Sequence, residues 1–161
     1  MAAHEDALDE IYRRHAAAVF RRARRLMGSD ADAQDVVHDV FLSLFERPEQ
    51  FGARSALTTF LYSATTHACL ARIRQVKNRQ RLLESHAPES RAAEQPEALT
   101  DLHDALRKMP ELLARVAVYA WFDELSHAEI AALVGCSRRH VANLLERIEA
   151  WAREQEELSC C

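Results

Sequence analysis

The residues of this chain best suited to chemistry lie near its C-terminus, where a predicted helix carries basic and amide side chains on one face. The helix starts at Ser137 and presents Arg138, Arg139, Asn143 and Arg147. Guanidinium forks and side-chain amides hydrogen-bond the edges of guanine and adenine in the major groove of DNA. We therefore interpret this face as a DNA-reading surface.

The segment before that helix has the residues needed to position it. Ser126 followed by Glu129 is a capping-box pattern at the start of a shorter helix. Gly135 is suited to end that helix, and Ser137 to cap the next one. Two short helices joined by a tight turn form a helix-turn-helix, in which the second helix enters the major groove. An ordinary helical hairpin with a solvated basic face is the alternative.

A second candidate DNA surface lies on a long helix predicted over residues 56–83. Its polar and aromatic patch is followed by basic residues, and together these are Tyr62, Thr65, Thr66, His67, Arg72, Arg74 and Lys77. Aromatic side chains beside a basic track are what binding of single-stranded DNA requires. A basic helix face that is merely solvated is the alternative.

A third candidate surface lies on a helix predicted over residues 31–46, with Asp30 as its cap. One face is an apolar stripe at the helical period, made of Ala33, Val36, Val37, Val40, Phe41, Leu44 and Phe45. A helix over residues 6–27 precedes it, with Tyr12 on the same face as Leu8, Ile11, Val19 and Leu26. The opposite face is acidic, with Asp32, Asp35, His38 and Asp39 around the lone apolar Leu42. That face is either solvated or a contact for a partner.

Composition sets the fold class. Three glycines and four prolines in 161 residues predict an all-α protein. We expect two small helical domains, at residues 1–83 and 100–153, joined by a flexible proline-containing linker at 84–99 and followed by an acidic tail at 154–161. No apolar run reaches membrane-spanning length and the N-terminus is acidic, which predicts a cytoplasmic protein without membrane insertion. No catalytic constellation is present, so we do not expect an enzyme.

The charge is unevenly distributed along the chain, whose net value is −4. Residues 1–83 hold thirteen Lys and Arg against ten Asp and Glu, whereas residues 111–161 hold five against nine. Affinity for DNA depends largely on neutralising phosphates. The C-terminal domain is therefore expected to bind DNA weakly alone and to need a larger assembly.

The four cysteines divide into two kinds. Cys69 and Cys136 lie in predicted helical stretches, where cysteine usually acts as a small hydrophobe. Cys160 and Cys161 differ, because they end the chain and pack against nothing predictable.

Three segments in this order resemble the extracytoplasmic-function (ECF) sigma factors of bacterial RNA polymerase. The stretch from Ile11 to Phe45, which contains DAQDVVHDVFL, is similar to their regions 2.1 and 2.2. The stretch from Ser55 to Gln75, SALTTFLYSATTHACLARIRQ, is similar to regions 2.3 and 2.4, and that from Leu106 to Ala150 to region 4. The resemblance implies a factor that binds core polymerase and directs initiation at specific promoters.

The resemblance also implies roles for the candidate surfaces. The residues that would dock on the polymerase β′ clamp helices are Asp32, Gln34, Asp35, His38, Asp39 and Leu42. The long helix would bind and melt the −10 element, while the helix-turn-helix would read the −35 element beside the β flap. His67 stands where the family often has asparagine, which implies an unusual −10 specificity.

Regulation of such a factor has two candidate sources. An anti-sigma factor is a further partner implied for the family. The resemblance extends to a metal-responsive subgroup with a cysteine-rich C-terminal extension, of which Cys160 and Cys161 would be the beginning. It implies that these two cysteines are ligands for copper, zinc or cadmium, although two thiolates cannot enclose such a metal alone and further ligands would have to complete the site. An incidental cysteine tail with no cofactor is the alternative. A function of a different class stays open at this point, namely a thiol- or metal-sensing helix-turn-helix repressor that acts without polymerase.

Overall fold

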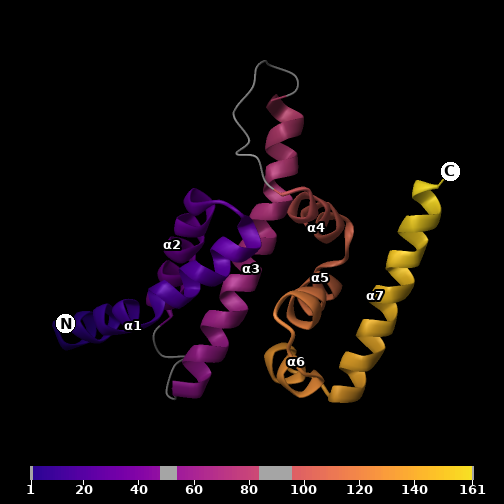
Figure 1. Ribbon diagram of the computed structural model, residues 1–161. Coiled ribbons are helices and arrows are strands. Elements are labelled where there is room, and N and C mark those ends of the chain that lie inside the picture. Colours follow the sequence, from indigo (N-terminus) through magenta and orange to yellow (C-terminus); the bar gives the residue numbers. More distant parts are fainter. Residues whose placement is uncertain (1, 48–53, 84–95, 161) are drawn as a thin grey trace. The chain divides into compact units, whose positions relative to one another are not determined.

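The computed structural model describes residues 2–47, 54–83 and 96–160, and within them the side chains of 6–47, 57–75 and 96–160. Every element in these ranges is a helix, in agreement with the all-α prediction (Figure 1). The chain divides into two compact units, Met1–His103 and Asp104–Cys161, with the division inside α4 (Glu97–Lys108). Most of the predicted linker lies outside the described residues, so its extent stays a prediction.

The first unit is built on three helices, each of which packs on the other two. They are α1 (Ala2–Met27), α2 (Asp30–Glu46) and α3 (Arg54–Leu83). The six buried residues of α2, from Ala33 to Leu44, all belong to the apolar stripe predicted for it. Such a stripe favours a helix because burial of its apolar surface is the main driving force for packing. The predicted stripe therefore faces the core.

The turn between α1 and α2 differs from the prediction in its cap. Gly28 ends α1 with φ +75°, a left-handed conformation that glycine adopts without strain. Ser29 then caps α2, because its Oγ accepts a hydrogen bond from the backbone N–H of Asp32 at 3.3 Å. The predicted cap, Asp30, is instead the first residue of the helix. A serine one position earlier satisfies the orphan backbone donors of the first turn.

Two aromatic residues of the predicted helix faces are exposed. Tyr12 is 44 % exposed and Phe45 is 37 % exposed. Both rings lie against the buried Phe41, with centroids 4.9 Å and 6.1 Å from it. The apolar stripe of α2 is therefore wider than the face that α1 and α3 cover.

The second unit holds the predicted helix-turn-helix. Its helices are α5 (Glu111–Ala117), α6 (His127–Val134) and α7 (Arg138–Ser159), with a π-helical turn at Val118–Phe122 after α5. The π-helical turn replaces the end of the helix predicted over 111–122. The core consists mainly of Leu113, Val116, Val118, Tyr119, Ile130, Val141, Leu144 and Ile148.

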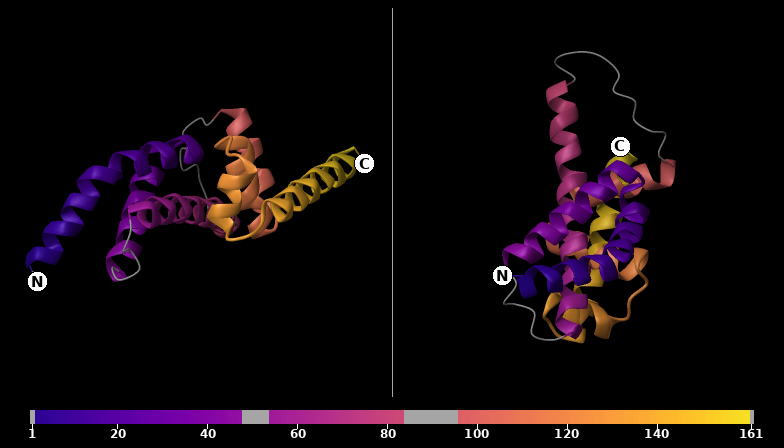
Figure 2. Two further views of the ribbon diagram at one scale, coloured as in Figure 1. Left: turned by 90° about the horizontal axis from the view of Figure 1, so that it is seen from below. Right: turned by 90° about the vertical axis from the view of Figure 1, so that its left-hand side faces the viewer.

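Helix α7 continues well past the core of its unit, as the further views show (Figure 2). It runs to Ser159, so most of the predicted acidic tail forms its last turns. Leu158 on these turns is 72 % exposed. No helix in the described ranges is both long enough and apolar enough to cross a membrane.

Candidate functional site

The start of α6 is fixed by a complete capping box. Oε2 of Glu129 accepts a hydrogen bond from the backbone N–H of Ser126 at 2.8 Å, and Oγ of Ser126 accepts one from the backbone N–H of Glu129 at 3.3 Å. The hydrogen bonds from the backbone and side chain of Ser126 lower the pKa of Glu129 below its ordinary value. This local network sets where the first helix of the pair begins, as the sequence predicted.

Two residues shape the turn between α6 and α7, one of which ends α6 while the other caps α7. Gly135 ends α6 at φ +77°, and its N–H donates to the carbonyl of Ala131 at 2.9 Å. Oγ of Ser137 then accepts a hydrogen bond from the N–H of His140 at 3.1 Å. Because the hydroxyl of Ser137 is used as a helix cap, its first role is to orient α7. Any contact it makes with DNA comes in addition to the cap.

The recognition face of α7, defined as Arg138, Arg139, Asn143 and Arg147, is exposed along its whole length. The opposite side of the helix is anchored by the buried Val141, Leu144 and Ile148. A helix held by one apolar stripe presents its other face at a fixed angle. The face therefore carries three guanidinium groups and one amide on a rigid support, as base-edge reading requires.

The predicted DNA patch on α3 is only partly a surface. Thr65 and Thr66 are 1 % and 0 % exposed, so the prediction that they contact DNA is wrong. Oγ1 of Thr65 donates to the carbonyl of Leu61 at 2.6 Å, and Oγ1 of Thr66 donates to the carbonyl of Tyr62 at 3.2 Å. Hydroxyls that bond to the preceding turn of their own helix are compatible with burial, because their polar groups are satisfied.

Arg22 of α1 is a residue that the sequence analysis missed. Its Nη1 donates to the carbonyl of Tyr62 at 3.2 Å and its Nη2 donates to Oγ1 of Thr66 at 2.8 Å. Its guanidinium carbon also lies 3.9 Å from the centroid of the Tyr62 ring, a cation–π contact. Arg22 falls at the helical spacing of the buried Val19 and Leu26, and that spacing is the signal that could have found it.

The remaining residues of the α3 patch differ in exposure. His67 is exposed, while Tyr62 and Arg74 are half-buried. The side chain of Lys77 lies outside the described residues. Among the described residues of the patch, exposed His67 and the accessible parts of Tyr62 and Arg74 thus remain for contact with a nucleic acid.

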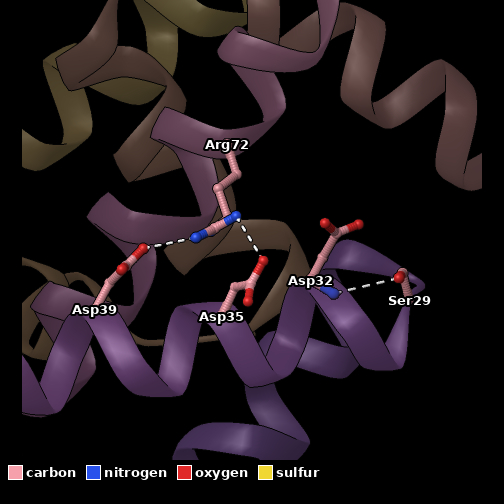
Figure 3. A network of polar contacts seen from close by, with 5 residues as sticks. All are labelled: Ser29, Asp32, Asp35, Asp39 and Arg72. Atoms are coloured by element: carbon pink, nitrogen blue, oxygen red, sulfur yellow. Dashed lines mark hydrogen bonds and ion pairs between the residues drawn. The ribbon is translucent and has the colours of Figure 1, made fainter.

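The acidic face of α2, defined as Asp32, Gln34, Asp35, His38, Asp39 and Leu42, is exposed except for the half-buried Asp32. Arg72, which the sequence analysis placed among the DNA contacts, reaches this face from α3 (Figure 3). Its Nη1 lies 3.2 Å from Oδ2 of Asp35, and its Nη2 lies 2.8 Å from Oδ2 of Asp39. The two carboxylates are therefore held as a pair.

An apolar groove of about 710 Å³ borders the acidic face between α1 and α2. It is lined mainly by Tyr12, Phe20, Val37, Phe41, Leu42 and Phe45. Leu42 is 48 % exposed and belongs both to the groove and to the acidic face. The surface next to the carboxylates is thus suited to a partner that brings apolar side chains as well as positive charge.

The three cysteines that the structure describes differ in exposure. Cys69 is fully buried, Cys136 is half-buried, and Cys160 is exposed at the end of α7. Cys161 lies outside the described residues. Within the described part of the chain, no three His, Cys, Asp or Glu residues are grouped so that they could hold a metal ion.

Comparison with protein families and curated proteins gives matches over most of the chain. Residues 11–79 match sigma-70 region 2, and residues 99–151 match sigma-70 region 4. The chain is 27 % identical over 145 residues to the ECF RNA polymerase sigma factor SigM of Mycobacterium tuberculosis, covering 89 % of this chain and 74 % of SigM. It is 25 % identical over 157 residues to the RNA polymerase sigma factor YlaC of Bacillus subtilis, covering 89 % and 88 %.

A further relative and one solved structure agree with these matches. The ECF RNA polymerase sigma factor SigE of Mycolicibacterium smegmatis is 28 % identical over 151 residues, covering 86 % of this chain and 57 % of SigE. The fold resembles the sigma factor RpoE of Bartonella quintana, crystallised with the anti-sigma factor NepR, with a TM-score of 0.52 and 16 % identity. That match covers 92 % of this chain and 96 % of the other.

Proposed function

The chain belongs to the ECF group of the sigma-70 family, and we propose that it docks on core RNA polymerase through α2 and reads promoter DNA through α3 and α7. Sigma factor function gives it two macromolecular partners, core polymerase and promoter DNA. The assignment of surfaces rests on one observation, namely that the acidic and the basic surface lie in different units of the chain. An acidic face bordered by an apolar groove lies in the first unit, and a basic recognition face lies in the second.

The acidic face and the groove together support docking on polymerase. Exposed carboxylates on α2 would attract a basic partner helix, and Leu42 beside them would give apolar contact area. We infer that the β′ clamp helices are this partner. Charge complementarity of this kind raises the rate and specificity of association more than the affinity.

The charge of the second unit supports a reader that depends on polymerase. Residues 111–161 carry five arginines against nine acidic residues, so phosphate attraction is weak outside the recognition face. A repressor that acts alone needs tight binding to duplex DNA and has no need of sigma-70 region 2, which residues 11–79 match. We infer that the second unit reads the −35 element next to the β flap of the polymerase.

Two kinds of regulation form part of the proposal. The resemblance in fold to a sigma factor crystallised with an anti-sigma factor supports a similar inhibitor here, for which the apolar groove is a suitable docking site. A metal response is the second kind. Cys160 is exposed, and a copper, zinc or cadmium ion held by Cys160 and Cys161 would need further ligands from elsewhere.

Run-off transcription with core polymerase on a promoter library tests the assignment of surfaces. Arg138→Ala and Arg139→Ala should each relax base preference in the −35 element, since a base-reading arginine contributes about 1–3 kcal/mol. Arg153→Ala is the matched control, because Arg153 is exposed on the same helix and lies about 20 Å further along its axis.

The outcomes of this experiment are distinct. Equal weakening of all promoters by Arg138→Ala and Arg139→Ala would limit these residues to phosphate contacts. No transcription by the unmodified protein with core polymerase on any promoter would contradict the function itself.

A further inference from the structure

Arg72 contacts two aspartates and thereby links two surfaces for which the sequence predicts different roles, the DNA patch on α3 and the acidic face of α2. Arg72 lies on α3, the helix with the predicted −10 contacts, yet its guanidinium bridges Asp35 and Asp39 on the docking face of α2 (Figure 3). Its side chain is 25 % exposed, whereas those of Asp35 and Asp39 are 61 % and 49 % exposed. The arginine therefore lies beneath the two carboxylates, which face the solvent.

The bridge leaves half of each carboxylate available. Both hydrogen bonds end on an Oδ2 atom, at 3.2 Å for Asp35 and 2.8 Å for Asp39. Among the described residues, Oδ1 of either aspartate has no hydrogen-bond partner. Each carboxylate can thus accept a bond from a docking partner without releasing Arg72.

The bridge also offsets the repulsion between two carboxylates on α2. Asp35 and Asp39 are four residues apart on one helical face, a spacing at which like charges repel each other. Without Arg72 the two side chains would separate and sample several rotamers. A planar guanidinium with two parallel donor groups fixes both at once, which a lysine ammonium cannot do with the same geometry.

The same geometry argues against a DNA contact at this position. The guanidinium and the two aspartates together carry a net charge of −1, so the cluster repels a phosphate. The two outer nitrogens of Arg72 are also already engaged as donors. A phosphate could bond only to the remaining N–H groups of this guanidinium, next to two carboxylates that repel it.

We propose that Arg72 is a positioning residue of the polymerase-docking face, which holds Asp35 and Asp39 in the arrangement that the polymerase binds. This inference rests on the proposed function, since it takes α2 as the docking surface. The benefit is preorganisation, because side chains that are already ordered lose less entropy on binding. Arg72 thus acts on polymerase affinity through the aspartates and not through a contact of its own.

A double-mutant cycle on the full chain tests the inference, with affinity for core polymerase as the readout. Arg72→Gln should weaken binding about 5- to 10-fold, the lower end of what the lost preorganisation of two side chains costs, because aspartate side chains are short. Arg72→Lys should restore at most part of the loss. In the Asp35→Asn, Asp39→Asn background, Arg72→Gln should have no further effect, because nothing remains for it to position.

Controls separate positioning from stability and from loss of charge. Arg13→Gln breaks an exposed arginine–aspartate pair within α1 and should leave the affinity unchanged. Thermal unfolding followed by circular dichroism should show all variants folded at the assay temperature, because partly exposed ion pairs contribute little to stability. A purely structural role would weaken binding by the same factor in both backgrounds, which contradicts the proposal.

The other outcomes also decide between explanations. Tighter core binding by Arg72→Gln would mean that the bridge competes with the polymerase, and the proposal would be wrong. Unchanged core affinity, with weaker promoter binding by the assembled holoenzyme, would instead assign Arg72 to a phosphate contact. If Asp35→Asn with Asp39→Asn leaves core affinity unchanged, the docking surface itself fails. That last result is distinguishable because it does not depend on Arg72.

Discussion

Thr66→Val is the substitution that best separates the role of this residue in the structure from the role that the sequence suggested. Valine has nearly the shape of threonine and lacks the hydroxyl. Oγ1 of Thr66 accepts a hydrogen bond from Nη2 of Arg22 at 2.8 Å and donates one to the carbonyl of Tyr62 at 3.2 Å. The change therefore removes one of the links between α1 and α3 while it preserves packing.

The expected magnitude follows from the charge of the donor. A hydrogen bond to a charged group contributes about 1.5–3 kcal/mol to stability, and a partly exposed arginine can replace some of that with water. The bond from Thr66 to the carbonyl of Tyr62 adds little, because a helical carbonyl keeps its backbone partner. We expect Thr66→Val to lower the free energy of unfolding of the first unit by about 1–2 kcal/mol.

The positions of the tryptophans allow each unit to be followed separately. Both tryptophans, Trp121 and Trp151, lie in the second unit, so their fluorescence follows the unfolding of that unit. Far-ultraviolet circular dichroism reports on helices of both units. In urea, the unfolding of the first unit contributes a part of the dichroism transition that tryptophan fluorescence does not follow. Thr66→Val should lower the urea midpoint of that part by roughly 0.5–1 M. The fluorescence transition should stay where it is.

Thr65→Val is the matched control. Thr65 is also buried, but its hydroxyl only donates to the carbonyl of Leu61 in its own helix. We expect a change within about 0.5 kcal/mol, since this kind of bond does not stabilise a helix. Equal effects of the two substitutions, or a Thr66→Val protein of unchanged stability with altered promoter choice, would refute the structural role of Thr66.

Three further predictions concern the exposed residues and the helix cap. His67→Asn should change the preferred base at one −10 position while −35 preference stays the same, as measured on a promoter library; identical preferences would remove His67 from the promoter contacts. The pKa of Glu129 is lower in the folded protein than its ordinary value, so the ionised carboxylate stabilises the second unit at pH values above the ordinary glutamate pKa. This contribution should be lost as the pH falls through the lowered pKa. Tryptophan fluorescence in urea should show that loss, and Glu129→Gln should show none of this pH dependence. Copper, zinc or cadmium should change transcription by the protein, and Cys160→Ala with Cys161→Ala should remove the response; transcription indifferent to all three metals would leave the cysteines without a sensing role.

Local rules were sufficient to predict the helix-turn-helix. Ser126, Gly135 and Ser137 act within a few residues of themselves, through backbone groups that every helix end leaves without a partner. Their roles as caps could therefore be predicted from the sequence, as could the exposure of Arg138 and Asn143 opposite a buried stripe. The apolar stripe of α2 was predictable for the same reason, because the helical period alone brings its members to one face.

The sequence alone determined which helices form and where the chain carries basic and acidic faces. Only the tertiary structure decided which polar residues on those faces are available for binding. Thr66 looks like a surface residue beside His67, yet α1 covers it and Arg22 bonds to it across 44 positions of sequence. Arg72 looks like a phosphate contact, yet α2 brings two carboxylates to it. Contacts between helices distant in sequence depend on how the helices pack, and helical periodicity specifies a face without specifying what will cover it.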